Sequence, residues 1–229
     1  MTTGLDRRLR LLQAAALTST CDRFAIAPLL VVISLDLGAS LATVAGVASA
    51  YFLAYGLMQP VWGLISDRIG RVRVMRTALL GAAVAGVGSV LAPNVAVLGL
   101  TRAVAGGCFA ALIPATLVYV GDAWPVAVRQ RPLSDVLAAA SLGVAAATAG
   151  AGLLADLVGW RAVPGVTAAA AVALWFALAR LPEPGGDPSM RDPAAAHPWH
   201  SLRGVLRTPW ALAVLALAVS EGIGVRGVL

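Results

Sequence analysis

Residues 63–73 read Gly-Leu-Ile-Ser-Asp-Arg-Ile-Gly-Arg-Val-Arg, a charged stretch with two glycines in a chain that is otherwise mostly apolar. Glycine lets two helices approach closely and tolerates a positive φ, so Gly63 and Gly70 predict a tight reversal between two packed helices. Asp67 can pair with a helix N-terminus or with an arginine, and Arg71 can pair with an acid at the end of a neighbouring helix. The stretch therefore predicts two apolar helices joined by a short charged turn.

The composition of the whole chain agrees with apolar helices. Of its 229 residues, 59% are hydrophobic and 12% are charged, and the mean hydropathy is +0.86. Soluble domains are about 45–50% apolar and about 25% charged, and disordered chains need low hydrophobicity, so a soluble enzyme and a disordered chain are both excluded. The net charge is +6, but the basic residues are all arginines in short clusters between apolar runs. We therefore expect a lipid bilayer, and no nucleic acid, as a partner.

Six segments are long and apolar enough to cross a bilayer, which takes about 20 mostly apolar residues. They are residues 9–35, 41–65, 74–92, 95–120, 133–158 and 162–181. The first is expected to be an uncleaved span, because its apolar stretch is longer than the h-region of a signal peptide. The predicted fold class is an all-α membrane protein with a six-helix transmembrane bundle over residues 1–181.

The next segment has a different composition. Residues 182–207 are rich in proline and glycine and cannot continue a helix, so we expect a flexible cytoplasmic loop. Residues 208–229 are expected to be a truncated seventh transmembrane helix. His197 and His200 lie in the loop without cysteine or acidic ligands nearby, so no metal site is predicted.

The arginines predict the orientation. Thirteen of the 17 lie at the N-terminus or in alternate loops, on the side that also holds residues 63–73. Cytoplasmic loops carry an excess of Lys and Arg, so the N-terminus is expected in the cytoplasm. The chain is accordingly expected to be a multi-pass protein of the inner (plasma) membrane.

An internal repeat is visible in the sequence. Residues 63–70 recur in degenerate form at residues 152–159, an offset of 89, and Pro28 corresponds to Pro114 at an offset of 86. Three predicted spans separate the copies, so the copies must lie on opposite sides of the membrane. Inverted three-helix repeats are a transporter architecture, and chance similarity in an Ala/Gly/Leu-rich chain is the alternative explanation.

Residues 63–73 resemble the loop signature of the major facilitator superfamily, G-x-x-x-D-R-x-G-R followed by further basic residues. The matching positions, with the later basic residue, are Gly63, Asp67, Arg68, Gly70, Arg71 and Arg73. The sequence departs at Val72, where a basic residue is frequent. The resemblance implies half of the superfamily's fold, a charge cluster that latches two halves together, and an Asp67 that meets a helix of the second half. Asp122, at the predicted cytoplasmic end of the fourth span, is our candidate partner for Arg71.

Three charges fall inside predicted spans, away from the span ends. Asp22 and Arg23 lie in the first and Arg102 in the fourth. Each costs about 2.5–3.5 kcal/mol at a helix centre, so such residues usually face a cavity or one another. The 1.5 Å rise per residue puts Asp22 and Arg102 at one depth, and we expect them to form a pair that protonation of Asp22 loosens. Residues 98–111 also resemble the family's fourth-span pattern, whose arginine is associated with proton coupling; an arginine that caps buried carbonyls is the alternative.

Other residues are candidates for the cavity wall or for packing. Arg23 is one, and a stripe along the second span is formed by Tyr51, Tyr55, Met58 and Trp62, with Gln59 beside it. Such a stripe either stacks on substrates or packs against a neighbouring helix. The glycines expected at helix contacts are Gly106, Gly143, Gly150 and Gly152. Antiporters of the family carry G-P-x-x-G-G in the fifth span, but here Ala147 and Thr148 stand in place of Gly-Pro.

The predicted function is secondary active transport, with proton-coupled efflux of small amphipathic compounds by a truncated chain that resembles drug/H⁺ antiporters. No enzyme activity, no cofactor and no metal are expected, and the proton gradient is the expected source of energy. One alternative is a non-transporting fragment or a half-transporter that needs the missing C-terminal half or a second chain. Another is uptake of a small metabolite.

Overall fold

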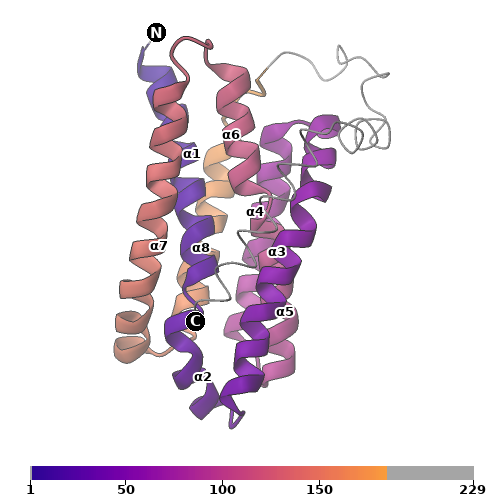
Figure 1. The fold of residues 1–229 in the computed structure, drawn as a ribbon, viewed down its shortest axis with the longest axis vertical. Coiled ribbons are helices and arrows are strands. Elements are labelled where there is room, and N and C mark those ends of the chain that lie inside the picture. Colours follow the sequence, from indigo (N-terminus) through magenta and orange to yellow (C-terminus); the bar gives the residue numbers. More distant parts are fainter. Residues whose placement is uncertain (1, 185–229) are drawn as a thin grey trace, which may run out of the picture. The chain divides into compact units, whose positions relative to one another are not determined.

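The structure, a computed structural model, describes residues 2–184 (Figure 1). The helices in this part are α1 (Thr2–Phe24), the 3₁₀ turn η1 (Ala27–Leu29), α2 (Leu30–Asp36), α3 (Leu41–Ile69), α4 (Arg71–Val90), α5 (Val95–Phe109), α6 (Leu112–Ala123), α7 (Gln130–Val158) and α8 (Ala162–Leu178). They correspond to the six predicted spans, of which five are long and apolar enough to cross a membrane and α8 is shorter, with 17 residues. Most of the predicted loop at residues 182–207, and all of the predicted helix at residues 208–229, lie outside the described residues.

The first and fourth spans are broken helices, although both were predicted to be continuous. The first passes from α1 through η1 into α2, and the fourth from α5 into α6. Pro28 lies in η1, between α1 and α2, and Pro114 is the third residue of α6. Proline has no N–H group for the carbonyl four residues earlier and its ring clashes with that carbonyl, so the helix ends before it. The two prolines matched by the repeat thus have the same structural effect in both copies.

The charged loop is shorter than predicted, because a single residue makes the reversal. Gly70 separates α3 from α4 with φ 104° and ψ 159°, and Gly159, its counterpart in the repeat, has φ 106° and ψ 154° between α7 and the turn before α8. Glycine is the residue that adopts such a positive φ without steric cost. Gly63, in contrast, lies within α3, and a Cβ added there would meet nothing within 4 Å among the described residues, so the close contact expected at this glycine is not found within residues 2–184.

The two three-helix repeats pack against each other. The main contacts join α1 to α7, α3 to α5 and α4 to α8 (Figure 1). A Cβ added to Gly106 would lie 2.6 Å from the Tyr51 carbonyl oxygen, and one added to Gly143 would lie 2.6 Å from the Leu17 carbonyl oxygen. The predicted close contacts therefore exist at these two glycines, one in each crossing pair.

Gly150 and Gly152 do not make the close helix contacts predicted for them. A Cβ added to either would meet nothing within 4 Å. Both lie toward the end of α7, where its exposed residues include Leu153 and Leu157. Exposed apolar side chains are expected on a membrane-spanning helix, so here composition alone did not distinguish a packed glycine from an exposed one.

Candidate functional site

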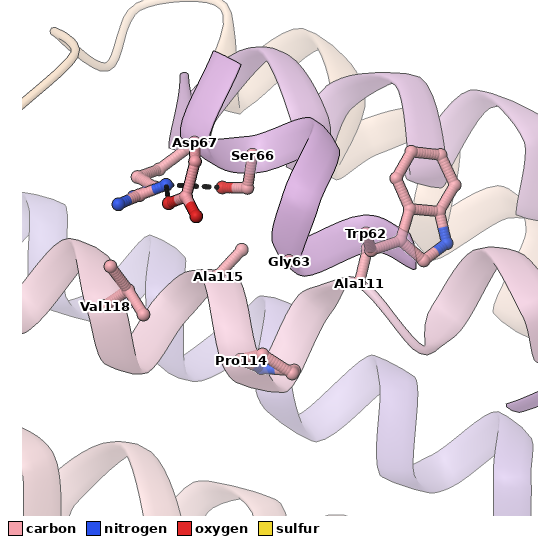
Figure 2. A pocket seen from close by; sticks show the side chains of 9 residues that line it. Trp62, Gly63, Ser66, Asp67, Ala111, Pro114, Ala115 and Val118 are labelled. Carbon is pink, nitrogen blue, oxygen red and sulfur yellow. Dashed lines mark hydrogen bonds and ion pairs between the residues drawn. The ribbon is translucent and has the colours of Figure 1, made fainter. Parts of the chain in front are cut away.

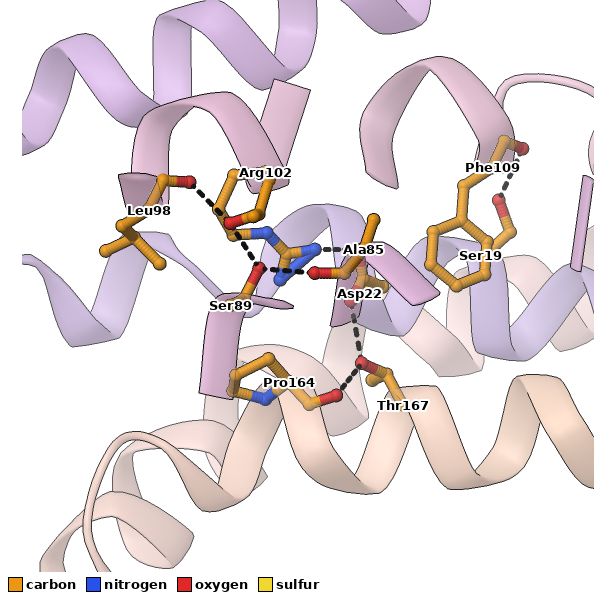
Figure 3. A network of polar contacts seen from close by, with 10 residues as sticks. Ser19, Asp22, Ala85, Ser89, Leu98, Arg102, Phe109, Pro164 and Thr167 are labelled. Carbon is orange, nitrogen blue, oxygen red and sulfur yellow. Dashed lines mark hydrogen bonds and ion pairs between the residues drawn. The ribbon is translucent and has the colours of Figure 1, made fainter. Parts of the chain in front are cut away.

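A buried ion pair joins the first and fourth spans, as predicted from their depths. Nη2 of Arg102, in α5, donates to Oδ2 of Asp22, in α1, over 2.5 Å (Figure 3). The Asp22 side chain is 1% exposed and that of Arg102 is 7% exposed. Taking two charges out of water is costly unless the geometry is good and further hydrogen bonds satisfy them, so the surroundings of the pair are important.

A threonine of the sixth span completes the site, and the sequence analysis did not identify it. The Thr167 hydroxyl in α8 donates to Oδ1 of Asp22 over 2.7 Å. Both carboxylate oxygens are therefore occupied, one by Arg102 and one by Thr167 (Figure 3). The Arg102 guanidinium also lies 5.2 Å from the centre of the Tyr51 ring. Asp22 thus holds three spans together through one carboxylate.

Other polar contacts surround this pair. Ser19 in α1 donates to the carbonyl of Phe109 over 3.2 Å, and Ser89 in α4 donates to Thr101 over 3.0 Å (Figure 3). Polar residues that face one another inside a bilayer act as links between helices. The interior of the bundle is therefore crossed by a polar layer around Asp22.

The charged loop lies at one end of the bundle, which we call the signature end. Nη1 of Arg71 lies 2.6 Å from Oδ1 of Asp67 and donates to the Ser66 hydroxyl over 3.2 Å (Figure 2). Nε of Arg71 lies 3.4 Å from Oδ2 of Asp122, so the structure brings together the pair chosen from the sequence. Ser66, Asp67 and Arg71 border a cavity of about 160 Å³ between α3 and α6, whose other lining residues are Trp62, Gly63, Ala111, Pro114, Ala115 and Val118.

Glu183 is a second residue that the sequence analysis missed. It follows α8 and accepts hydrogen bonds from the backbone N–H groups of Val72, over 3.1 Å, and Arg73, over 3.0 Å. The first N–H groups of a helix lack intrahelical partners and attract negative charge, so Glu183 satisfies and stabilises the start of α4. The Tyr119 hydroxyl holds the adjacent Pro182 carbonyl at 2.9 Å. The sequence feature that could have indicated this role of Glu183 was an acidic residue just after the sixth predicted span.

The opposite end of the bundle, which carries Trp160, has its own charge cluster. Oδ2 of Asp36 accepts from Nε1 of Trp160 over 3.0 Å and from Nη1 of Arg161 over 2.5 Å. Arg161 also donates to the Ala92 carbonyl over 3.3 Å. The Asp36 and Arg161 side chains are 42% and 39% exposed. This cluster joins the ends of the first, third and sixth spans.

The aromatic stripe on α3 is mainly a packing surface. Tyr51 and Tyr55 are 1% and 5% exposed, so they do not face an open cavity in the described part of the chain. Met58 and Gln59 are half-buried, and Nε1 of Trp62 donates to the Gly107 carbonyl over 2.7 Å. Of the other loop residues, Arg68 and Arg73 are exposed. The predicted non-ligands His197 and His200 lie outside the described residues.

Comparison with known proteins identifies the family. The family model described as Major Facilitator Superfamily matches residues 13–227. A triacylglyceride transporter of Mycolicibacterium smegmatis is 31% identical over 132 residues, which cover 56% of this chain and 24% of that protein. A puromycin resistance protein of Streptomyces alboniger is 33% identical over 127 residues, which cover 55% of this chain and 25% of that protein. The chain thus matches about a quarter of the length of these relatives.

Solved structures show the same fold. A proton:xylose symporter of the superfamily aligns with a TM-score of 0.68 at 16% identity, over 80% of this chain and 46% of that one. A peptide transporter aligns with a TM-score of 0.70 at 16% identity, over 94% of this chain and 46% of that one. The chain therefore corresponds to about half of a complete transporter fold. With the inverted repeat and the loop at residues 63–73, these matches establish that the chain is a multi-pass membrane protein of the Major Facilitator Superfamily, a family of transporters and not of enzymes.

Proposed function

We propose that this chain is a transporter that exports small amphipathic compounds in exchange for protons. The observation that carries the proposal is the buried Asp22–Arg102 pair with its third partner, Thr167. Ionisable residues inside membrane spans are costly and commonly belong to proton relays or substrate paths. The named functions of the relatives, triacylglyceride transport and puromycin resistance, support a substrate with a large apolar part.

The chemistry of the pair suggests how a proton would act. Ionised Asp22 attracts the Arg102 guanidinium and accepts from Thr167, and so links α1, α5 and α8. Protonation removes the negative charge and turns one carboxylate oxygen into a donor, which weakens both links. The proposed cycle therefore alternates between a tight ionised site and a looser protonated site, and the proton gradient supplies the energy.

The test is efflux from vesicles that contain only this chain. We expect loss of a fluorescent amphiphile to depend on an imposed pH gradient, and Asp22→Asn to lower the gradient-driven rate at least tenfold. Asp156→Asn is the matched control, because Asp156 is exposed near the end of α7, and its rate should equal that of the wild type. Gradient-driven efflux at the wild-type rate by Asp22→Asn would exclude the proposed proton carrier.

A second candidate is a half-transporter that works only with a second set of six spans. It is favoured by the alignment, which covers 46% of each of the two solved transporters. An experiment that varies the number of chains per vesicle distinguishes the two candidates. Efflux that rises linearly with the number of chains per vesicle supports the single chain, whereas a second-order rise indicates that two copies form one pathway.

A further inference from the structure

Of Asp22, Arg23 and Arg102, the charges in the middle of the described spans, Arg23 is the one for which the site above provides no role. It lies in the last turn of α1, next to Asp22, and is only partly buried. Its guanidinium carbon lies 4.8 Å from the centre of the Phe24 ring and 4.7 Å from the centre of the Tyr55 ring. Its Nε atom is buried but has no hydrogen-bond partner, and no ion pair to Arg23 is found among residues 2–184.

The charges in the middle of the described spans do not balance. Asp22, Arg23 and Arg102 lie close together in the interior of the bundle, and together they carry one excess positive charge. The single negative charge of Asp22 is matched by Arg102, with which it forms the ion pair, and so leaves the charge of Arg23 in excess. The acids near the helix ends, such as Asp36 and Asp122, are engaged in the clusters at those ends. Among residues 2–184, no anion compensates this excess, so an anion from outside the described residues would complement the charge of Arg23.

The two aromatic rings stabilise the positive charge of Arg23 in the absence of such an anion. They also leave free the N–H donors with which Arg23 can bind one. Aromatic faces attract a guanidinium through its positive charge, but they leave its in-plane N–H donors unused. Those donors form a planar fork that matches the oxygens of a carboxylate or a phosphate. Phe52, which is 44% exposed and whose ring lies 6.1 Å from that of Phe24, extends an apolar surface beside the fork.

We propose that Arg23 binds the anionic group, a carboxylate or phosphate, of an amphipathic ligand whose apolar part lies against Phe24 and Phe52. This inference rests on the proposed function, because it names the charge class of the compounds that the chain handles. It implies that an anionic amphiphile binds better than a cationic one with the same apolar body. The anionic group belongs either to a small-molecule substrate or to the headgroup of a membrane lipid, and the two sources give different results in the experiment below.

The experiment measures binding without a proton gradient, so it does not depend on proton coupling by Asp22. The full chain is placed in nanodiscs of phosphatidylcholine, and two dansyl probes with the same undecyl chain are titrated, one ending in a carboxylate and one in a trimethylammonium group. We expect the carboxylate probe to bind at least tenfold more tightly. Arg23→Gln should remove that preference by weakening the carboxylate probe alone, and Arg23→Lys should keep part of it, because the charge remains but the fork is lost.

Arg76→Gln is the matched control. Arg76 also lies over an aromatic ring, that of Trp175 at 5.0 Å, but it contacts α8 and is remote in sequence from the α1 site. Its substitution should leave the ratio of the two affinities unchanged. If the ligand is a small molecule, phosphatidylglycerol in the nanodisc should not compete with the carboxylate probe. If phosphatidylglycerol does compete and Arg23→Gln abolishes the competition, the subsite binds a lipid headgroup. Equal affinities for the two probes, no binding of the carboxylate probe, or an equal loss for both probes in Arg23→Gln would overturn the proposal.

Discussion

Asp36 and Asp122 occupy equivalent places in the two repeats, 86 positions apart, and each pairs with an arginine of the other repeat. Asp36 ends α2 and pairs with Arg161, whereas Asp122 lies at the end of α6 and pairs with Arg71. In both cases the arginine lies one or two residues after a glycine with φ near 105°. The inverted repeat therefore produces an ionic contact at each end of the bundle, with the buried Asp22–Arg102 pair between them.

The interior pair should be coupled strongly in a double-mutant cycle. Asp22→Asn or Arg102→Gln alone leaves an uncompensated polar or charged group in the interior, and such changes cost about 3–5 kcal/mol. The double variant removes both charges. Its loss of free energy of unfolding should therefore be smaller than the summed losses of the two single variants, by at least about 1 kcal/mol. Unfolding in mixed micelles by SDS titration measures this difference.

The exposed pair at the opposite end provides the control for that cycle. Asp36→Asn and Arg161→Gln act on side chains that are 42% and 39% exposed. Pairs at this exposure contribute about 0–1 kcal/mol and are screened by salt. Additive effects at Asp22 and Arg102, or a coupling no larger than that of the exposed pair, would contradict the assigned structural role.

Thr167→Val should separate the hydrogen bond from the ion pair. The change keeps the side-chain shape but removes the donor to Oδ1 of Asp22, and we expect a loss of about 1–2 kcal/mol in the free energy of unfolding. Thr148→Val is the control, because Thr148 is exposed on α7 and bonds to its own helix. The two variants are compared in the same SDS titration, and equal stabilities would show that Thr167 contributes nothing to the site.

Gly70→Ala and Gly159→Ala should differ although the two glycines have the same backbone conformation. Each change imposes strain of about 1–3 kcal/mol, because φ is positive at both positions. A Cβ at position 70 would also lie 2.6 Å from the Glu183 carboxylate, whereas one at position 159 meets nothing within 4 Å. Gly70→Ala should therefore be less stable by about another 1 kcal/mol, the size of one lost cap. Equal losses of stability would mean that Glu183 does not stabilise α4.

The orientation predicted from the arginines is checked by labelling introduced thiols. Arg68 is exposed at the signature end and Leu157 is exposed at the opposite end, near matching positions of the repeat. In intact cells, a reagent that cannot cross the membrane should label Leu157→Cys and spare Arg68→Cys until the membrane is opened. Labelling of Arg68→Cys from outside would reverse the predicted topology.

The sequence predicted the spans because about 20 apolar residues between charged turns are distinctive in any chain. It also predicted the Asp22–Arg102 contact, since the rise per residue fixes depth along a helix. It could not predict rotation about each helix axis, which decides that Gly143 meets α1 while Gly150 and Gly152 do not. Thr167 and Glu183 were missed because their roles depend on partners more than 100 positions away.

Glu183 also bears on how the protein is assembled during synthesis. Its partners at the start of α4 leave the ribosome 110 residues or more before the carboxylate does, so they stay uncapped until the sixth span has been made. A nascent chain that stops before Pro182 would carry all six spans and still lack this closing contact. The contact that closes the six-span bundle therefore forms at the turn around Gly70, and it forms only after the sixth span has been made.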